Sequence, residues 1–347
     1  MRFYSKQHRY YCGIDLHART MYVCVLDQAG KVRLHRNLPC DRDRFLRAIK
    51  PYRRDLVVAA ECMFTWYWLA DLCAEHAIPF VLGHALYMKA IHGGKTKNDR
   101  IDALKIASLL RGGNIPMAYV YPAKMRSTRD LLRRRTRLVR VRASLFGHVR
   151  NTRSQHNVPA IAAKIRYPAN RDPFTEGFDD PVVVRAVEAD LWQAEFLDGL
   201  IRDLELFLRK KTRVFSPTVY HRLRTVPGIG AILGMTILYE IHDIRRFPRV
   251  QDFVSYARLV KCPTESAGKR TGTAGAKIGN PHLKWAFSEA AVLLLRQSDA
   301  VKRYHARLQA KHGKGKALSI LAHKLGRAVY FMLKRKQAFD LEVFLKR

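Results

Sequence analysis

Residues 10–37 read YYCGIDLHARTMYVCVLDQAGKVRLHRN, and this stretch decides the fold of the first part of the chain. Apolar residues dominate 10–16 and 20–26, and a polar turn at 28–30 separates them from a third segment at 31–37. Short apolar runs that end at turn residues are typical of β-strands. The stretch therefore predicts three consecutive strands that meander through one sheet.

Helix and strand patterns alternate after these three strands. Residues 55–61 (DLVVAAE) and 79–84 predict buried strands, and the segments at 41–50, 64–76 and 98–111 predict helices. The last helix follows Gly93-Gly94 and ends at Gly112-Gly113, which are strong helix breakers. A three-strand meander followed by alternating helices and strands predicts an α/β domain of RNase H-like fold.

The charge of the chain is the first indication of its partner. The 347 residues include 64 Lys and Arg against 29 Asp and Glu, for a formal net charge of +35. So large an excess of positive charge favours a polyanionic partner, and nucleic acid is favoured over an anionic membrane surface. The chain has no apolar run of the roughly 18 residues that a membrane span needs, and its N-terminus has no apolar signal core. We therefore expect neither a membrane protein nor a secreted one.

Six cysteines occur without any C-x-x-C pair. This spacing excludes a zinc ribbon and a thioredoxin-like motif. We expect the cysteines to be small core residues of a protein in a reducing cytoplasm.

Two long helices are predicted between the α/β part and the C-terminal part. The first, at 124–150, is rich in arginine and contains a single acid, Asp130, so salt bridges within the helix cannot offset its charge. We expect it to contact phosphate through six arginines: Arg126, Arg129, Arg133, Arg134, Arg137 and Arg140. The second helix, at 183–211, has an apolar seam spaced by seven residues, which fits either a coiled-coil dimer contact or a helix of an intramolecular bundle.

The sequence thus predicts three domains. Residues 1–122 form the RNase H-like domain, and 123–215 form the basic helix with the coiled-coil connector. Residues 216–347 form a mainly helical C-terminal domain, which again carries a strong positive charge.

Four carboxylates in the first domain form a candidate metal site. Asp15 lies within an apolar strand, where an unpaired acid is costly, and Glu61 ends a second buried strand. Asp99 and Asp102 are three residues apart at the start of a helix, so both can face one point. Such oxygen ligands suit Mg²⁺ or Mn²⁺, and a pair of these ions serves phosphodiester chemistry in many enzymes. His17 lies two residues after Asp15, and a place near the metal and a structural role both remain open.

The C-terminal domain contains two segments of interest. Residues 227–230 (PGIG) join two apolar helices, as in a helix-hairpin-helix turn, and the backbone N–H groups around Gly228 and Gly230 are candidates for binding phosphate. The Gly-, Ser- and Thr-rich stretch at 262–285 contains Ser266, either a turn residue or a nucleophile. Three cations near this serine are candidates for stabilising charge on phosphate: Lys269, Arg270 and Lys277.

Five segments taken in order resemble a known family. They are GIDLH at 13–17, Glu61 after its strand, KNDRIDA at 97–103, PGIG at 227–230 and SAGK at 266–269. Together they resemble the DEDD transposases of bacterial insertion sequences, which are also described as bridge-RNA-guided recombinases. The resemblance extends over nearly the whole chain.

The resemblance implies a RuvC-like domain, a coiled-coil connector and a C-terminal transposase domain. The four acids of the family name would be Asp15, Glu61, Asp99 and Asp102, and the catalytic serine would be Ser266. Implied further are Mg²⁺ or Mn²⁺ as cofactor, a structured guide RNA, target and donor DNA as substrates, and a covalent phosphoserine–DNA intermediate. It also implies a homo-oligomer of at least two subunits with shared active sites, in the bacterial cytoplasm and associated with the nucleoid.

Three other functions remain open from the sequence. A Holliday-junction nuclease of RuvC type would use the same acids and water, without the serine. An architectural nucleic-acid-binding protein would need neither the acids nor the serine for catalysis. A sugar-kinase-like ATPase shares the aspartate in its first strand, but it would need glycine-rich phosphate loops that this sequence lacks and has no use for a charge of +35.

Overall fold

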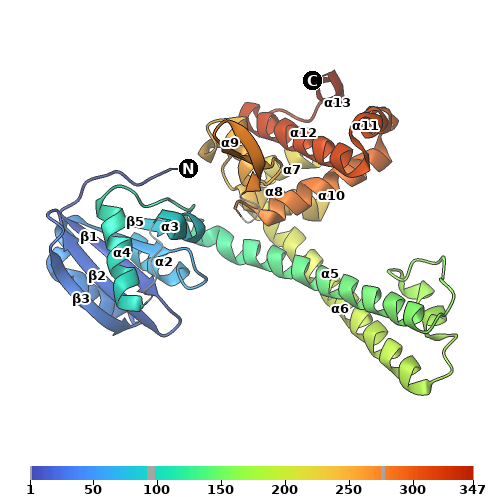
Figure 1. The fold of residues 1–347 in the computed structure, drawn as a ribbon, viewed down its shortest axis with the longest axis horizontal. Helices are drawn as coiled ribbons and strands as arrows, with labels where there is room; N and C mark the ends of the chain where they lie inside the picture. The colour runs from blue at the N-terminus through green and yellow to red at the C-terminus, as the bar shows by residue number, and fades with distance from the viewer. Residues whose placement is uncertain (1, 92–97, 275–277, 347) are drawn as a thin grey trace. The chain divides into compact units, whose positions relative to one another are not determined.

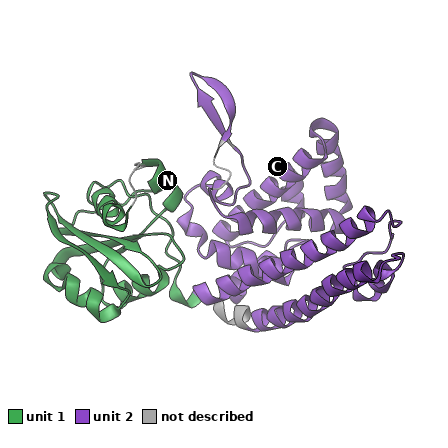
Figure 2. Ribbon diagram, turned by 60° about the horizontal axis from the view of Figure 1, so that its bottom comes forward, with its two compact units in different colours: residues 1–124 green, residues 125–347 purple. Residues whose placement is uncertain are grey.

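The protein is described here from a computed structural model, which covers residues 2–91, 98–274 and 278–346. It forms two compact units, residues 1–124 and residues 125–347 (Figure 2). The first boundary falls two residues from the predicted end of the α/β domain. The predicted boundary after residue 215 lies inside the second unit, and the three-domain division stays a prediction.

Unit 1 is built on a five-stranded mixed sheet in the order β3-β2-β1-β4-β5 (Figure 1). The strands β1, β2 and β3 form an antiparallel meander, and β4 and β5 continue the sheet parallel to β1. This arrangement is consistent with the predicted RNase H-like domain. The strands are β1 (Tyr10–Leu16), β2 (Thr20–Asp27), β3 (Val32–Pro39), β4 (Leu56–Glu61) and β5 (Phe80–Gly83).

Helices cover both faces of this sheet, because its central strands are apolar on both sides. In β4, Val58 and Ala60 face one apolar cluster, whereas Val57 and Ala59 face the other. Such continuous apolar strands are typical of parallel strands buried between two helical layers. The elements outside the sheet are α1 (Arg42–Ile49), η1 (Lys50–Asp55), α2 (Tyr67–Glu75), α3 (Ala85–Ile91) and α4 (Asp99–Arg111). The predicted helices and strands of this unit are confirmed to within a few residues at their ends, whereas α3 was not expected.

Unit 2 begins with an antiparallel pair of long helices, α5 (Ala123–Gln155) and α6 (Pro181–Phe215). Three ion pairs connect them along their length: Arg135 with Glu205, Arg142 with Asp198, and His148 with Asp190. The predicted seam of α6 is buried within the unit at Val187, Ala194, Ile201 and Leu208. Packing within the chain therefore accounts for the heptad pattern, and a subunit contact through α6 stays a prediction.

The remaining helices of unit 2 surround one large apolar core. Met125 and Leu132 of α5 and Leu208 of α6 belong to the same core, which is why the connector and the C-terminal helices form one unit. The helices are α7 (Pro217–Arg224), α8 (Ala231–Ile241), α9 (Val250–Tyr256), α10 (Pro281–Gln297), α11 (Asp299–His312), α12 (Lys314–Arg335) and α13 (Leu341–Lys346), with η4 (Ile244–Arg246) after α8. None of the described helices is both long and apolar enough to cross a membrane.

A two-stranded ribbon, β6 (Cys262–Ser266) and β7 (Lys269–Ala274), projects from the helices of unit 2 (Figure 2). The composition of this stretch, rich in Gly, Ser and Thr, did not predict strands. The β-branched threonines at 264, 271 and 273 were the available signal, because such residues favour strands.

Candidate catalytic and nucleic-acid-binding sites

The sheet places Asp15 and Glu61 at neighbouring strand ends. β1 and β4 are parallel, and Ile14 pairs with Ala60, so the next residues on the two strands are Asp15 and Glu61. Side chains alternate along a strand, so Asp15 is on the same face of β1 as Gly13, against which α4 packs. The sheet topology thus places Asp15 and Glu61, two of the four predicted acids, at one edge of the domain.

Gly13 lets α4 lie directly on β1. A Cβ at this position would come within 2.2 Å of the backbone nitrogen of Ala107 and 2.4 Å of the carbonyl oxygen of Ala103. The N-terminus of α4 is fixed by Asn98, whose side chain accepts a hydrogen bond from the N–H of Ile101 at 2.8 Å. Asp99 and Asp102 lie in the first turn of this helix, where the helix dipole favours acids.

Asp15, His17 and Asp99 meet at this edge. The Nε2 atom of His17 lies 3.3 Å from Asp15 Oδ2 and 3.3 Å from Asp99 Oδ2. Burial raises the pKa of Asp15; His17 opposes this shift, and the charges of Asp99 and Asp102 add to it. The domain therefore holds like charges close together around Asp15, and Asp102 is also 3.4 Å from Nζ of Lys105.

This donor set fits a divalent metal ion. One ligand atom from each of Asp15, His17 and Asp99 lies within 4.8 Å of the other two. Burial is the main cause of the raised pKa of Asp15, and a divalent cation would relieve the smaller contribution from the charges of Asp99 and Asp102. Glu61 and Asp102 are not members of this three-residue group in the described part of the chain. His17, whose role was open from the sequence, is thus placed among the candidate ligands.

Ser266 lies at the tip of the β6–β7 ribbon. It pairs with Lys269 across a turn made of Ala267 and Gly268, whose φ angles of 48° and 73° are both positive, as in a type I′ hairpin turn. Ser266, Lys269 and Arg270 are exposed. The third predicted cation of this segment, Lys277, lies outside the described residues.

The six arginines predicted for α5 fall into two sets. Arg134, Arg137 and Arg140 are exposed, as a phosphate-binding surface requires. The structure differs from the prediction at Arg126 and Arg129, which are buried, and at Arg133, which is half-buried. Arg129 and Arg133 contact Glu240 of α8 within unit 2, whereas all six arginines were expected to contact phosphate.

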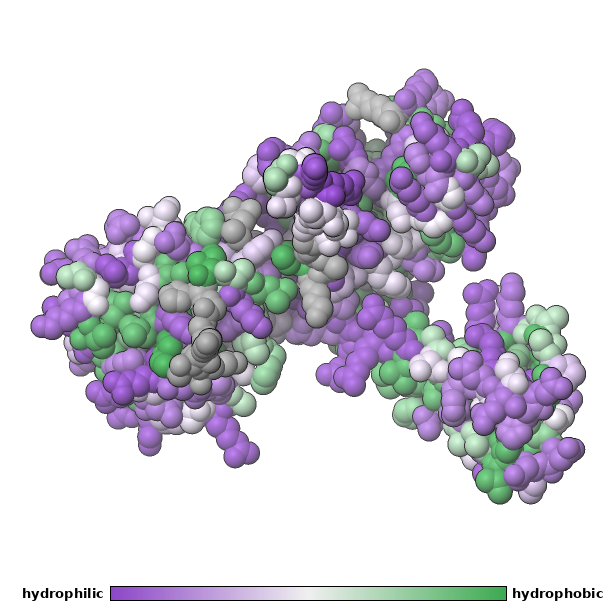
Figure 3. Space-filling view, viewed as in Figure 1, coloured by the Kyte–Doolittle hydropathy of each residue, from purple (hydrophilic) through white to green (hydrophobic). Residues whose placement is uncertain are grey.

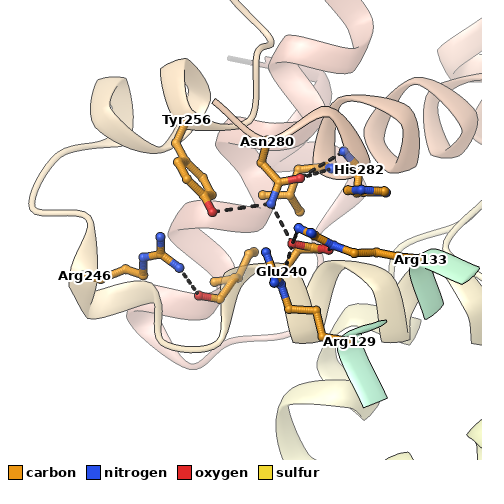
Figure 4. Close-up of polar contacts among 9 residues, drawn as sticks. Arg129, Arg133, Glu240, Arg246, Tyr256, Asn280 and His282 are labelled. Carbon is orange, nitrogen blue, oxygen red and sulfur yellow. Dashed lines mark hydrogen bonds and ion pairs between the residues drawn. The ribbon is translucent and has the colours of Figure 1, made fainter. Parts of the chain in front are cut away.

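Glu240 of α8 explains the inward position of two of these arginines (Figure 4). Its buried carboxylate accepts hydrogen bonds from Arg129 Nε at 2.9 Å, from Arg133 Nε at 2.6 Å and from Asn280 Nδ2 at 2.7 Å. Burial disfavours the charged form, but the hydrogen bond from Arg133 and the charges of both arginines outweigh it. The pKa of Glu240 therefore lies below its ordinary value.

Asn280 extends this network to the base of the ribbon. Its Oδ1 accepts hydrogen bonds from the N–H groups of His282 and Leu283 and so caps α10, and its own N–H donates to the carbonyl of Tyr256 at 2.6 Å. This bond to Tyr256 holds the end of α9 and the start of α10 together, at the base of the segment that carries Ser266. This network was not predicted, although Glu240 is an acid within the apolar helix at 231–241, the same kind of signal that singled out Asp15.

The PGIG turn joins α7 to α8 as predicted, but its two glycines differ. Gly228 is buried, and its N–H donates to Oε1 of Gln297 at 2.9 Å, so this N–H is engaged within the protein rather than offered to phosphate. A Cβ at Gly228 would lie 2.6 Å from the backbone nitrogen of Leu294, so glycine permits the close contact with α10. Gly230 is exposed at the start of α8 and stays a candidate for phosphate binding.

Comparison with known proteins identifies the class of this fold and site. A family model described as "Transposase IS116/IS110/IS902 family" matches residues 220–306, and a DEDD transposase model of the IS110 type, described as "Transposase", matches residues 12–156. The second match includes all four predicted acids, and the first includes Ser266 and the PGIG turn.

Transposases from several bacteria are similar to the chain over most of its length. The transposase for insertion sequence element IS1111A from Coxiella burnetii is 22% identical, over 94% of this chain and 90% of the relative. A probable family 20 transposase from Pseudomonas aeruginosa is 23% identical, over 94% of this chain and 97% of the relative. The chain belongs to the IS110 family of DEDD insertion-sequence transposases.

Proposed function

We propose that this transposase exchanges DNA strands through a covalent bond between Ser266 and DNA, with a divalent metal held by Asp15, Glu61, Asp99 and Asp102. The observation that carries the proposal is the convergence of Asp15, His17 and Asp99 at the edge of the sheet, in a domain that matches the DEDD family. Membership of a transposase family makes DNA the substrate.

The proposed reaction replaces one phosphoester with another. Ser266 Oγ forms a bond to the scissile phosphorus while the bond from phosphorus to a sugar oxygen breaks; the serine hydroxyl loses its proton, and the sugar oxygen gains one. The reverse reaction with a new sugar hydroxyl rejoins the strand, so no ATP is required. Mg²⁺ or Mn²⁺ at the carboxylates would polarise the scissile phosphate. The exposed tip of the ribbon, with Lys269 and Arg270 beside the serine, suits attack on a large substrate.

The remaining parts of the proposal concern partners. A structured guide RNA selects target and donor DNA by base pairing, and the charge of +35 suits the combined phosphates of RNA and DNA. The carboxylates of one subunit act with the serine of another in a homo-oligomer of at least two chains. This complex works in the bacterial cytoplasm, at the nucleoid, with the three-domain division described above.

A covalent-adduct assay tests the reaction. The full-length protein is mixed with RNA transcribed from the ends of its element, Mg²⁺ and labelled junction DNA, and is then denatured. We expect a protein–DNA adduct that survives denaturation and is lost in Ser266→Ala and in Asp102→Asn, whereas Ser144→Ala, an exposed serine of α5, retains it. Cleavage that persists without an adduct in Ser266→Ala would overturn the serine mechanism in favour of a RuvC-type nuclease. An adduct that forms undiminished in Asp102→Asn would overturn the metal site. DNA binding with neither adduct nor cleavage in the unmodified protein would favour an architectural role.

A further inference from the structure

The connection between α5 and α6, residues 156–180, is long but well built. Connections longer than about 15 residues are uncommon in compact domains and are often functional. This one contains two short 3₁₀ turns, η2 (Pro168–Asn170) and η3 (Asp172–Thr175). Its Ile165 and Phe174 are buried in an apolar cluster with Phe146 of α5 and Leu191 of α6.

Two buried arginines hold the backbone of this connection in place. Arg153, at the end of α5, donates to the carbonyl oxygens of Phe174 and Glu176 through Nη1, at 3.2 and 2.8 Å, and to that of Pro159 through Nη2, at 2.9 Å. Arg171 donates to the carbonyl of Ile165 at 3.3 Å and forms an ion pair with Asp198 of α6. The connection is therefore fixed by polar contacts as well as by its apolar cluster.

Beside this connection lies a cavity of about 410 Å³ whose lining is strongly basic. Four of its six lining residues are cationic and exposed: Arg150 of α5, Lys164 and Arg166 of the connection, and Arg296 of α10. The other two are Ala163 and Ile165, so none of the described residues that line the cavity is acidic. Hydrophilic side chains also cover much of the visible end of the α5–α6 pair, at the lower right of Figure 3. Cations gathered around a hollow without a counter-charge form a site for phosphate groups.

An exposed aromatic ring lies next to these cations. The side chain of Tyr167 is 49% exposed. The guanidinium of Arg166 lies over its ring at 4.8 Å and donates to its hydroxyl at 2.8 Å. An exposed ring beside basic residues is the arrangement on which proteins stack unpaired bases.

We propose that this cavity and Tyr167 bind an unpaired segment of nucleic acid, with backbone phosphates among the four cations and a base on the tyrosine ring. A regular duplex keeps its bases stacked inside and presents a convex backbone, which suits neither a hollow nor an exposed aromatic ring. The site goes beyond the proposed strand exchange, because it uses none of the carboxylates, neither the serine nor its neighbouring cations, and none of Arg134, Arg137 and Arg140 of α5. Single-stranded RNA and single-stranded DNA share the chemistry that this site recognises.

Binding measurements on the full-length protein test the site. The probes are fluorescent oligouridine and oligothymidine of equal length and a duplex DNA, titrated by anisotropy at several salt concentrations. One variant replaces Arg150, Lys164, Arg166 and Arg296 with glutamine, and the matched control replaces four exposed cations of α11 and α12, Arg303, Arg307, Lys311 and Lys314. Tyr167→Ala and Tyr167→Phe test the ring without a change of charge.

The cavity variant is expected to bind the single-stranded probes at least about tenfold more weakly than the control variant does. The slope of the logarithm of the binding constant against the logarithm of the salt concentration should also become shallower, by about 0.7 for each phosphate contact that is lost. Tyr167→Ala is expected to lose about fivefold or more for single strands, Tyr167→Phe to retain binding, and both to leave duplex binding unchanged. A larger loss with oligouridine than with oligothymidine assigns the site to RNA, and the reverse assigns it to DNA. Equal losses in the cavity and control variants, or a Tyr167→Ala effect on duplex as large as on single strands, would overturn the proposal. Because the readout is binding, failure here is distinguishable from failure of the strand-exchange mechanism.

Discussion

Asn280 donates its side-chain N–H to the buried carboxylate of Glu240 at 2.7 Å. Because Asn280 is the N-cap residue of α10, this bond joins α8 to the start of α10. The same carboxylate receives Arg129 and Arg133 from α5. One acid therefore ties the arginine-rich helix to the base of the ribbon that carries Ser266. Glu240 is thereby a structural centre of unit 2, and the position of the ribbon base depends on it.

Replacement of Glu240 tests this dependence. Glu240→Ala leaves two arginines without their counter-charge, one of them buried, and loss of one partner from a buried charge pair costs about 3–5 kcal/mol. We expect the free energy of unfolding in urea to fall by this amount. Asp299→Ala, which removes an exposed carboxylate paired with Lys302, is the control and should cost less than about 1 kcal/mol. Similar losses in the two variants would contradict the central role of Glu240.

The stability of the protein should depend on pH through His282. Burial lowers the pKa of His282 to about 4, and the charges of Arg133, Arg129 and Arg140 contribute to this shift, against that of Glu240. Between its ordinary value of 6.5 and about 4, the unfolded chain binds a proton that the folded chain does not. The stabilising contribution of the neutral imidazole is thus complete above pH 6.5 and declines as the pH falls toward 4.

Burial lowers the pKa values of His242 and His323 as well, so these residues also make stability depend on pH. The contribution of His282 is therefore isolated by comparing the unmodified protein with a variant that lacks this imidazole. Between pH 6.5 and 4, we expect the stability of His282→Asn to decrease less than that of the unmodified protein. Thermal denaturation at a series of pH values gives both slopes. Parallel slopes would show that His282 does not contribute.

Gly13 should tolerate no side chain. The Cβ of Gly13→Ala would overlap the backbone of α4 at Ala103 and Ala107, so the helix must move away from β1. Overpacking of this kind costs about 1–3 kcal/mol, and it also displaces Asp99 and Asp102 from Asp15. We therefore expect lower stability together with weaker Mn²⁺ binding, measured by denaturation and by calorimetry.

Gly147 provides the control for this substitution. It lies within α5, and a Cβ there would meet nothing within 4 Å. Gly147→Ala should raise stability by about 0.5–1 kcal/mol, because alanine favours the helix. If Gly13→Ala were equally harmless, the close contact between β1 and α4 would not be a constraint on the site.

Metal binding should depend on the carboxylates individually. Asp15→Asn and Asp99→Asn each remove a charged oxygen ligand, so we expect Mn²⁺ affinity to fall at least about tenfold and DNA cleavage with it, while DNA binding is retained. Asp43→Asn, an exposed acid in the first turn of α1, makes the same change away from the site and should leave both properties intact. Calorimetric titration of Mn²⁺ and a cleavage assay check these outcomes. Unchanged Mn²⁺ affinity in Asp15→Asn would remove this residue from the metal site.

Local patterns predicted much of unit 1 and some of its candidate site. The alternation of apolar runs and turns at 10–37 predicted three strands, and they occur as β1, β2 and β3. The costly position of Asp15 in an apolar strand led to the acidic edge of the sheet. The role of His17 stayed open, because its distance from Asp99 depends on how α4 lies across β1.

Unit 2 was harder to predict, because its contacts join distant residues. Arg129 and Glu240 are 111 residues apart, and the arginine pattern of α5 looks the same whether a given side chain faces solvent or a buried acid. The heptad seam of α6 was equally compatible with a partner subunit and with packing inside the chain. The ribbon around Ser266 was obscured by a composition that is also typical of loops.

The sequence by itself determined the charge, the order of most helices and strands, the four candidate acids and the resemblance to a transposase family, because these depend on composition, short-range periodicity and motifs. Only the tertiary structure decided which arginines are buried, that the N–H of Gly228 is engaged within the protein, and that four cations from distant segments line one cavity. A side chain becomes buried, and finds its hydrogen-bonding partner, when segments far apart in the chain pack together. No local pattern in the sequence records which segments do so.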